Sequence, residues 1–230
     1  MINLVFCPKC GSQVEEHYAV CPNCGAKLKA DPQEKRTATQ HLSLAFNIAT
    51  SKPIVFVPVI LGGIISSLTD QIYVDSPGFG TLWLILSLIG SVIGFMLNFA
   101  STDMERNAYT DRPLDIMASM SYVAGRFVTF FLASIVAAVL AITIILIPVA
   151  SMMIVILVVD EAGIGEALSK AFSVISSDLG DIIVLIILSI LGHAILGLVP
   201  LVSWILTACF GVIMTIAYID VYEQHKRYNL

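Results

Sequence analysis

The residues that most clearly carry chemistry are four cysteines near the N-terminus. They form two Cys-Pro-x-Cys-Gly motifs, CPKCG at 7–11 and CPNCG at 21–25. Two residues between paired cysteines let one tight turn bring both sulfurs to the same side, and four thiolates match the ligand set of a tetrahedral Zn²⁺ ion. We therefore predict one zinc site, with the ligands Cys7, Cys10, Cys21 and Cys24.

The predicted zinc site is structural and not catalytic. Sulfur would fill all four positions, which leaves none for water or substrate. A segment as small as 1–28 cannot bury a sufficient core, so metal binding must supply its folding free energy. Iron in a rubredoxin-like site is the alternative. It is disfavoured because only Phe6, His17 and Tyr18 are available to pack around the two turns.

The doubled CPxCG pattern resembles the short zinc-ribbon modules found at the ends of many prokaryotic membrane and regulatory proteins. The resemblance implies a small β-type ribbon that holds structural zinc. Its lysines are balanced by nearby acidic residues, so it has no basic patch for nucleic acid. A cytoplasmic protein is the expected partner.

The rest of the chain has the composition of a membrane protein. Hydrophobic residues make up 57% of the sequence and charged residues 13%, against roughly 45–50% and 25% in soluble domains. We predict a ribbon at 1–28, a polar linker at 29–40, a membrane domain at 41–222 and a cytoplasmic tail at 223–230.

Five apolar stretches within the membrane domain predict six spans. The stretches lie at 54–68, 81–101, 127–159, 182–199 and 201–219. The third is too long for one span of about 20 residues and is interrupted at Ile147-Pro148, so we interpret it as a hairpin that turns at Pro148.

The positions of the basic residues support an even number of spans. With the N-terminus inside, six spans place all 12 Lys and Arg residues on the cytoplasmic side, as the positive-inside rule requires. Five spans would export Lys170, Lys226 and Arg227. We therefore expect an integral cell-membrane protein with both termini in the cytoplasm, and the lipid bilayer as its main environment.

An internal repeat precedes the spans. LSLAFNIATS at 42–51 aligns with LSKAFSVISS at 168–177, and a weaker copy lies at 114–123. Each has the apolar period of an amphipathic helix and is followed by a proline or glycine. The predicted fold class is an all-α polytopic membrane protein with about six transmembrane helices, three interfacial amphipathic helices and a small β-type zinc ribbon.

The segment VVDEAGIGEALSKAFSVISSDLGDIIVLIIL at 158–188 is similar to uncharacterised six-span prokaryotic membrane families. It also resembles the membrane domain of some glycerophosphodiester phosphodiesterases. In those enzymes the chemistry lies in a separate soluble domain, so the resemblance implies membrane architecture and not hydrolysis.

Few polar groups are expected inside the spans. No Asp, Glu, Lys or Arg lies between the expected helix ends, which argues against an ion-coupled transporter. His193 and Asn98 are the candidates for an intramembrane polar site, although a helix–helix hydrogen bond is the simpler role for His193.

Carboxylates gather at the expected cytoplasmic rim, where we interpret them as a solvated face with ion pairs and helix caps. No catalytic motif selects any of them, so we predict no catalytic residues and no enzymatic activity. The carboxylates are Asp103, Glu105, Asp111, Asp115, Asp160, Glu161, Asp178, Asp181, Asp220 and Glu223.

Two functions fit this pattern. The first is a membrane scaffold or regulatory protein whose ribbon contacts a cytoplasmic partner. The alternative is a passive transporter or lipid-handling protein with a cavity between its helical hairpins. A docking ribbon predicts an exposed apolar patch, whereas the alternative predicts a continuous polar cavity. The sequence leaves open the substrate, the identity of the partner and the oligomeric state.

Overall fold

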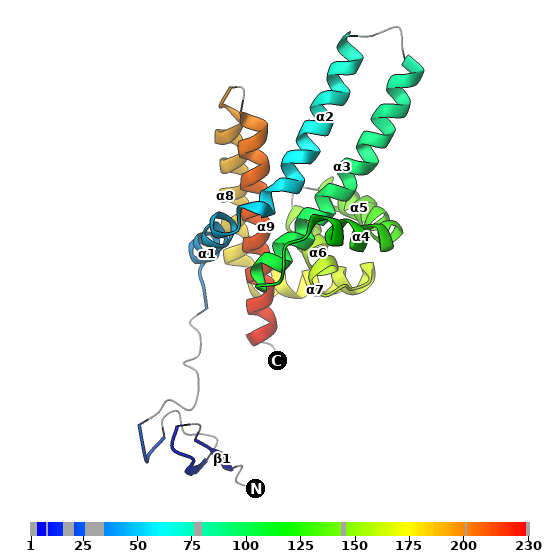
Figure 1. Ribbon diagram of the computed structural model, residues 1–230. Helices are drawn as coiled ribbons and strands as arrows, with labels where there is room; N and C mark the ends of the chain where they lie inside the picture. Colours follow the sequence, from blue (N-terminus) through cyan, green and yellow to red (C-terminus); the bar gives the residue numbers. More distant parts are fainter. Residues whose placement is uncertain are drawn as a thin grey trace. The chain divides into compact units, whose positions relative to one another are not determined.

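The computed structural model describes residues 4–7, 9–15, 21–25, 35–75, 80–143, 146–200 and 202–228. The chain divides into two compact units, Met1–Arg36 and Thr37–Leu230. The first contains the small β-type ribbon and the second is helical (Figure 1). The predicted fold class is therefore confirmed. Residues 29–34 of the predicted linker lie outside the described residues.

The ribbon contains two short antiparallel strands, β1 (Leu4–Phe6) and β2 (Gln13–Glu15), with Val5 opposite Val14. The two strands lie on either side of the first cysteine turn. Pairing across that turn fixes Cys7 at the end of β1, where it is buried against Val14 and Cys21.

The helical unit repeats one pattern three times. A short amphipathic helix leads through a sharp break into a pair of apolar helices. The amphipathic helices are α1 (Ala38–Ser51), α4 (Ile116–Gly125) and α7 (Ile164–Ser177). The apolar pairs are α2 (Val57–Asp75) with α3 (Gly80–Tyr109), α5 (Phe127–Ala141) with α6 (Ile147–Val159), and α8 (Leu179–Gly197) with α9 (Ser203–Tyr228). A 3-10 turn, η1 (Pro53–Phe56), joins α1 to α2.

Three element boundaries differ from the sequence prediction. Residues 38–40, assigned to the linker, form the start of α1, and Thr37 precedes them as the N-cap in a capping box with Gln40. Most of the predicted tail continues α9 to Tyr228. Pro148 lies in the first turn of α6 and not in the loop. That position suits proline because the first helical N–H groups have no partner within the helix.

Within the residues that the structure describes, three helices are long and apolar enough to cross a membrane: α3 from Trp83, α8 and α9. The number rises to as many as five if each bent pair, α1 with α2 (97°) and α4 with α5 (79°), is one span. With 15 and 13 residues, α5 and α6 would be roughly 22 and 20 Å long, short of a hydrocarbon core of about 30 Å. The six-span count therefore stays a prediction.

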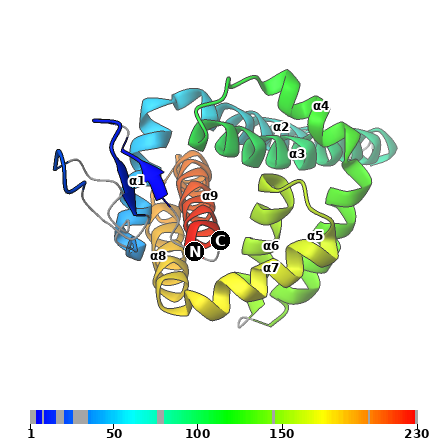
Figure 2. The same ribbon diagram turned by 90° about the horizontal axis from the view of Figure 1, so that it is seen from below.

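Helix α9 lies at the centre of the helical unit. It packs against α1, α2, α3, α6 and α8 (Figure 2). The α2–α3 and α8–α9 hairpins share a base near α1 and diverge from it (Figure 1). Large apolar side chains on the diverging parts, such as Leu88 and Ile195, are exposed. Such a surface suits lipid as the solvent.

Candidate zinc centre and polar cavity

The four predicted cysteine ligands converge in the ribbon. The Cys7 and Cys24 sulfurs are 3.7 Å apart, as are those of Cys10 and Cys21. All four lie within 4.8 Å of one another. Because Zn–S bonds are about 2.3 Å long, sulfurs of a tetrahedral site should be about 3.8 Å apart. The residues present therefore fit a structural zinc ion.

Local hydrogen bonds shape the two cysteine turns. Gly11 and Gly25 have φ angles of +72° and +69°, which favour glycine, and their N–H groups donate to the carbonyls of Cys7 and Cys21. Hydrogen bonds from the Ser12 side chain and backbone lower the pKa of the Cys10 thiol to about 6. Burial opposes ionisation of Cys21, but backbone hydrogen bonds from Asn23 and Cys24 outweigh it, so the pKa of Cys21 is also lowered. Both effects favour the metal-binding thiolate.

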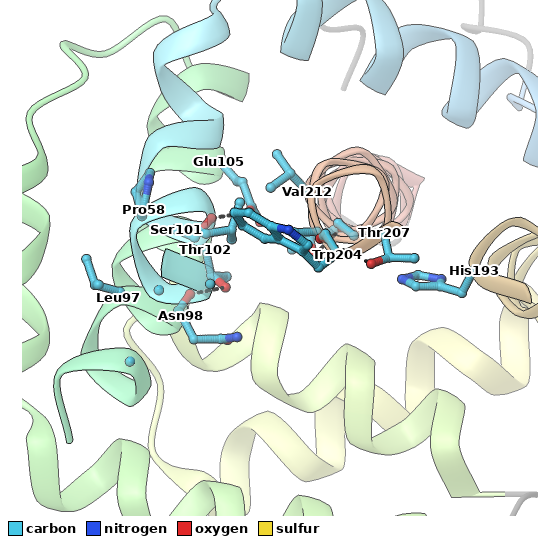
Figure 3. Close-up of a pocket in the computed structure, with 17 residues that line it drawn as sticks. Pro58, Leu97, Asn98, Ser101, Thr102, Glu105, His193, Trp204, Thr207 and Val212 are labelled. Atoms are coloured by element: carbon cyan, nitrogen blue, oxygen red, sulfur yellow. Dashed lines mark hydrogen bonds between the residues drawn. The ribbon is translucent and has the colours of Figure 1, made fainter. Parts of the chain in front are cut away.

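A second candidate site is a cavity of about 550 Å³ between the diverging hairpins. Helices α2, α3, α8 and α9 line it, and both predicted polar residues, Asn98 and His193, belong to the lining (Figure 3). Hydroxyl groups surround it as well, from Ser101, Thr102, Thr207 and Thr215. Its volume lies in the range of about 300–1,000 Å³ that is typical of small-molecule sites.

His193 does not make the predicted helix–helix hydrogen bond. Its Nδ1 lies 2.8 Å from the carbonyl oxygen of Ser189, one turn earlier in α8, and therefore donates to it. The ring meets Phe210 of α9 edge-on, with centroids 5.2 Å apart. Because Nδ1 is the donor, Nε2 of the neutral ring is left as an acceptor.

The sequence interpretation missed the buried acid of this cavity, Glu105. We expected the rim carboxylates to form a solvated face, but the exposed fraction of Glu105 is 2% and those of Asp103 and Asp220 are 3% and 0%. Helix α3 continues past Ser101, the last residue of the predicted span, and carries Asp103 and Glu105 into the protein interior, whereas Asp220 lies in α9. The sequence held one signal of the burial of Glu105. Ser101 and Glu105 are four residues apart, so they lie on the same face of a helix.

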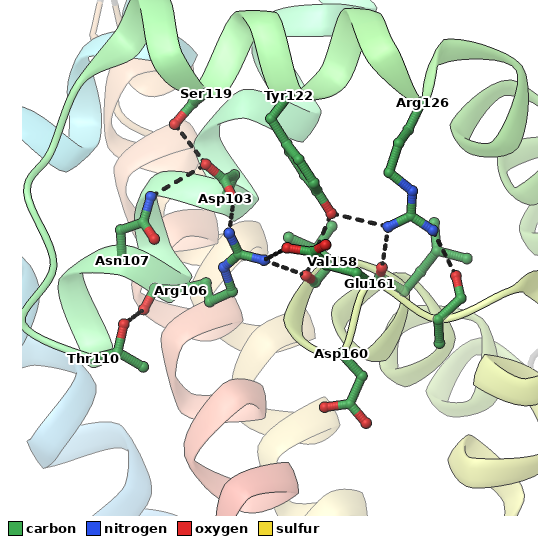
Figure 4. A network of polar contacts seen from close by, with 12 residues as sticks. Asp103, Arg106, Asn107, Thr110, Ser119, Tyr122, Arg126, Val158, Asp160 and Glu161 are labelled. Carbon is green, nitrogen blue, oxygen red and sulfur yellow. Dashed lines mark hydrogen bonds and ion pairs between the residues drawn. The ribbon is translucent and has the colours of Figure 1, made fainter.

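Asp103 belongs to a buried network that joins α3 to α4 and α6 (Figure 4). It accepts a hydrogen bond of 2.7 Å from Ser119 and pairs with Arg106 at 2.6 Å. Arg106 also donates to the carbonyl of Val158 at the end of α6 (2.8 Å). Arg126 donates to the carbonyls of Leu157 and Ala162 in the same region. Together the two arginines satisfy carbonyls that the end of α6 leaves unpaired.

Other rim carboxylates behave as predicted. Asp115 caps α4 by accepting from the N–H groups of Met117 and Ala118. Asp160 forms ion pairs with Lys170 (2.7 Å) and Lys226 (3.0 Å).

A buried cluster ties α1 to α9. His41 Nδ1 lies 2.6 Å from Asp220, whose other oxygen accepts from the Tyr109 hydroxyl at 2.7 Å. His41 and Asp220 are 179 positions apart in the chain, so nothing local in the sequence predicts this contact.

Comparison with known proteins supports the ribbon alone. Residues 6–28 match the zinc-ribbon domain family. No curated protein and no solved structure matches the chain. The protein is therefore a membrane-type helical protein that carries an N-terminal zinc ribbon with structural zinc.

Proposed function

We propose that the protein binds a lipid headgroup or another small polar molecule between its α2–α3 and α8–α9 hairpins. The observation that carries this proposal is the cavity of about 550 Å³, which is lined by hydroxyl, amide, imidazole and carboxyl groups on otherwise apolar helices. Such convergent polar groups in a concave site are typical of ligand binding. No catalytic step is part of the proposal.

The ribbon gives less support to docking as the main function. Its described exposed residues are Lys9, Cys10, Gly11, Gln13, Pro22, Asn23 and Gly25. Among them there is no large apolar side chain of the kind that a docking patch requires. The scaffold function remains a second candidate because the ribbon is a compact unit of its own whose zinc site leaves no open coordination position.

Filling the cavity tests ligand binding. Gly94 lines it, and a Cβ atom there would have no neighbour within 4 Å, so Gly94→Leu should fold and occupy the space. Gly197→Leu is the matched control, because Gly197 is equally free but does not line the cavity. Mass spectrometry of small molecules and lipids that co-purify should find a species bound to the wild type and to Gly197→Leu but lost from Gly94→Leu. An identical set in all three proteins would contradict the proposal.

The scaffold function is tested by crosslinking in native membranes. The intact protein is compared with a Cys7→Ser/Cys10→Ser variant, in which zinc binding is lost. A cytoplasmic protein captured only by the intact form would support docking by the ribbon, whereas equal capture would argue against it.

A further inference from the structure

The Glu105 carboxylate is only half satisfied. Oε1 accepts a hydrogen bond of 2.7 Å from the Ser101 hydroxyl. Oε2 is fully buried and accepts no hydrogen bond within the described part of the chain, because the nearby Thr215 hydroxyl donates to the Gly211 carbonyl instead (3.1 Å). The adjacent Arg106 does not compensate, because its guanidinium is directed to Asp103 and to the carbonyl of Val158.

Among the described residues that line the cavity, no other Asp, Glu, Lys or Arg faces Glu105. The lining residues from α2 and α9 are all uncharged, and α8 contributes His193 as the second titratable group of the described lining. An ionised carboxylate buried without a counter-ion is costly, so such a group is stable only when it holds a proton or a bound cation.

We infer that Glu105 is the recognition residue of this cavity and that its ligand carries a primary ammonium group, which replaces a proton on Glu105. This inference rests on the proposed function and assigns the chemistry of its ligand. The exchange is balanced: the neutral acid releases one H⁺ to water as the ammonium ion binds the resulting carboxylate. The ammonium group would come from an ethanolamine lipid headgroup or from a free amine.

Two further features favour an organic ammonium ion over a bare metal ion. The first is the volume of about 550 Å³, far more than one ion occupies. The second is Trp204, whose indole extends from α9 toward α2 and α3 (Figure 3) and contacts Gly63 so closely that a Cβ atom there would lie 2.6 Å from the ring. The indole lines the same cavity and can contact the apolar part of an organic ligand whose ammonium group is held by Glu105. The hydroxyl oxygens of Ser101 and Thr215, which lie beside Glu105, supply acceptors for the remaining hydrogens of that ammonium group.

Calorimetric titration of the purified full-length protein tests the exchange. The probes are short-chain phosphatidylethanolamine and free ethanolamine, each titrated in two buffers of different ionisation enthalpy. Binding of either probe should release up to one proton per ligand. The lipid arm alone should respond if the ammonium group comes from a headgroup, and both arms should respond if a free amine suffices.

Variants separate this inference from the proposed function. Glu105→Gln keeps the shape but holds no exchangeable proton, so it should weaken binding at least tenfold and abolish proton release. Glu166→Gln, an exposed carboxylate outside the cavity lining, should match the wild type. Trp204→Leu should weaken binding several-fold while it keeps proton release, which tests the site even if Glu105→Gln fails to fold.

Equal affinity and equal proton release in Glu105→Gln would overturn the role of Glu105. Absence of binding in both wild-type arms would overturn the ammonium ligand. In either case the proposed function is judged separately, by what Gly94→Leu loses on co-purification.

Discussion

At the scale of single residues, Arg126 is a side chain that lysine should not replace. Its guanidinium donates to two carbonyls at once, those of Leu157 (3.2 Å) and Ala162 (2.7 Å). A lysine ammonium is a point charge and lacks the planar fork that reaches both. We expect Arg126→Lys to cost about 1–3 kcal/mol, because a buried carbonyl loses its partner.

Tryptophan fluorescence can measure this loss during thermal unfolding, because both tryptophans, Trp83 and Trp204, belong to the helical unit. Arg112→Lys is the control, because Arg112 is exposed. Equal melting temperatures for Arg126→Lys and Arg112→Lys would show that the second hydrogen bond of Arg126 adds nothing.

Asp160 should make part of the protein's free energy of unfolding depend on pH. Burial alone would raise its pKa, but hydrogen bonds from Lys170, Tyr222 and Lys226 outweigh that effect, and the pKa is lowered below its usual 3.8. A lowered folded-state pKa stabilises the protein above the unfolded-state pKa, and this contribution is lost as the pH falls through the folded-state value. Asp160→Asn should therefore lose up to about 1 kcal/mol at pH 7 and show a smaller decline below about pH 4.

The matched variant for Asp160 is Asp111→Asn, because the Asp111 side chain is 90% exposed. It should keep the wild-type decline when melting temperature is followed from pH 7 to pH 3. If Asp160→Asn declines in parallel with the wild type, the Asp160 cluster does not control acid stability.

At the scale of elements, the internal repeat predicts that α1 and α7 pack in the same way, which can be tested in each helix. Ala45 of α1 and Ala171 of α7 hold the same place in the two aligned copies, and both are fully buried. Their neighbours Phe46 and Phe172 are 53% and 47% exposed. Ala45→Leu and Ala171→Leu should each destabilise the protein by about 1–3 kcal/mol through overpacking. Phe46→Ala and Phe172→Ala should stay within about 0.5 kcal/mol.

Tryptophan-detected melting of the four variants decides the question. The same ranking in α1 and α7 would support equivalent docking of the two helices. A large loss from either phenylalanine variant would mean that the exposed ring contributes to the folded core.

The same helices show how far sequence predicts this fold. Periodicity located α1, α4 and α7 but not their buried faces. In α4 the apolar period of 114–123 includes Met117, yet Met117 is 76% exposed, and the buried side holds Ser119, which donates to Asp103. In a membrane protein lipid and protein interior are both apolar, so an apolar stripe does not tell which of them it meets.

Sequence also predicts some residues of the candidate sites and not others. The zinc ligands were predictable because their spacing is local, and the ribbon geometry follows from it. Asn98 and His193, the candidates for an intramembrane polar site, both line one cavity. Glu105 was not, because its burial depends on how far α3 extends and on its packing against α2 and α9. Contacts between distant segments leave no periodic signal in one sequence.

At the scale of the whole molecule, the two compact units should respond separately to metal removal. Chelation of zinc, or Cys10→Ser, should unfold the ribbon because metal binding supplies its folding free energy. The helical unit has its own core, so its tryptophan-detected melting temperature should not change. Zinc content and melting should be measured on the same samples. Cys209→Ser, which alters the cysteine of α9, should retain one zinc per chain, and a joint loss of zinc and helical stability would contradict independence.

The side of the membrane on which the C-terminus lies tests the number of spans. An even number and an odd number of spans place it on opposite sides. Six spans, or four spans with α5 and α6 as a re-entrant hairpin, return the C-terminus to the side of the N-terminus. Five spans, with each bent pair crossing once and α6 not crossing, place it on the opposite side. We expect the even count, because the last turn of α9 carries His225, Lys226 and Arg227, and basic residues are retained in the cytoplasm. C-terminal fusions should therefore give a fluorescent cytoplasmic reporter and an inactive alkaline phosphatase. The opposite pair of results would require an odd number of spans and would place Lys226, the ion-pair partner of Asp160, at the outer face.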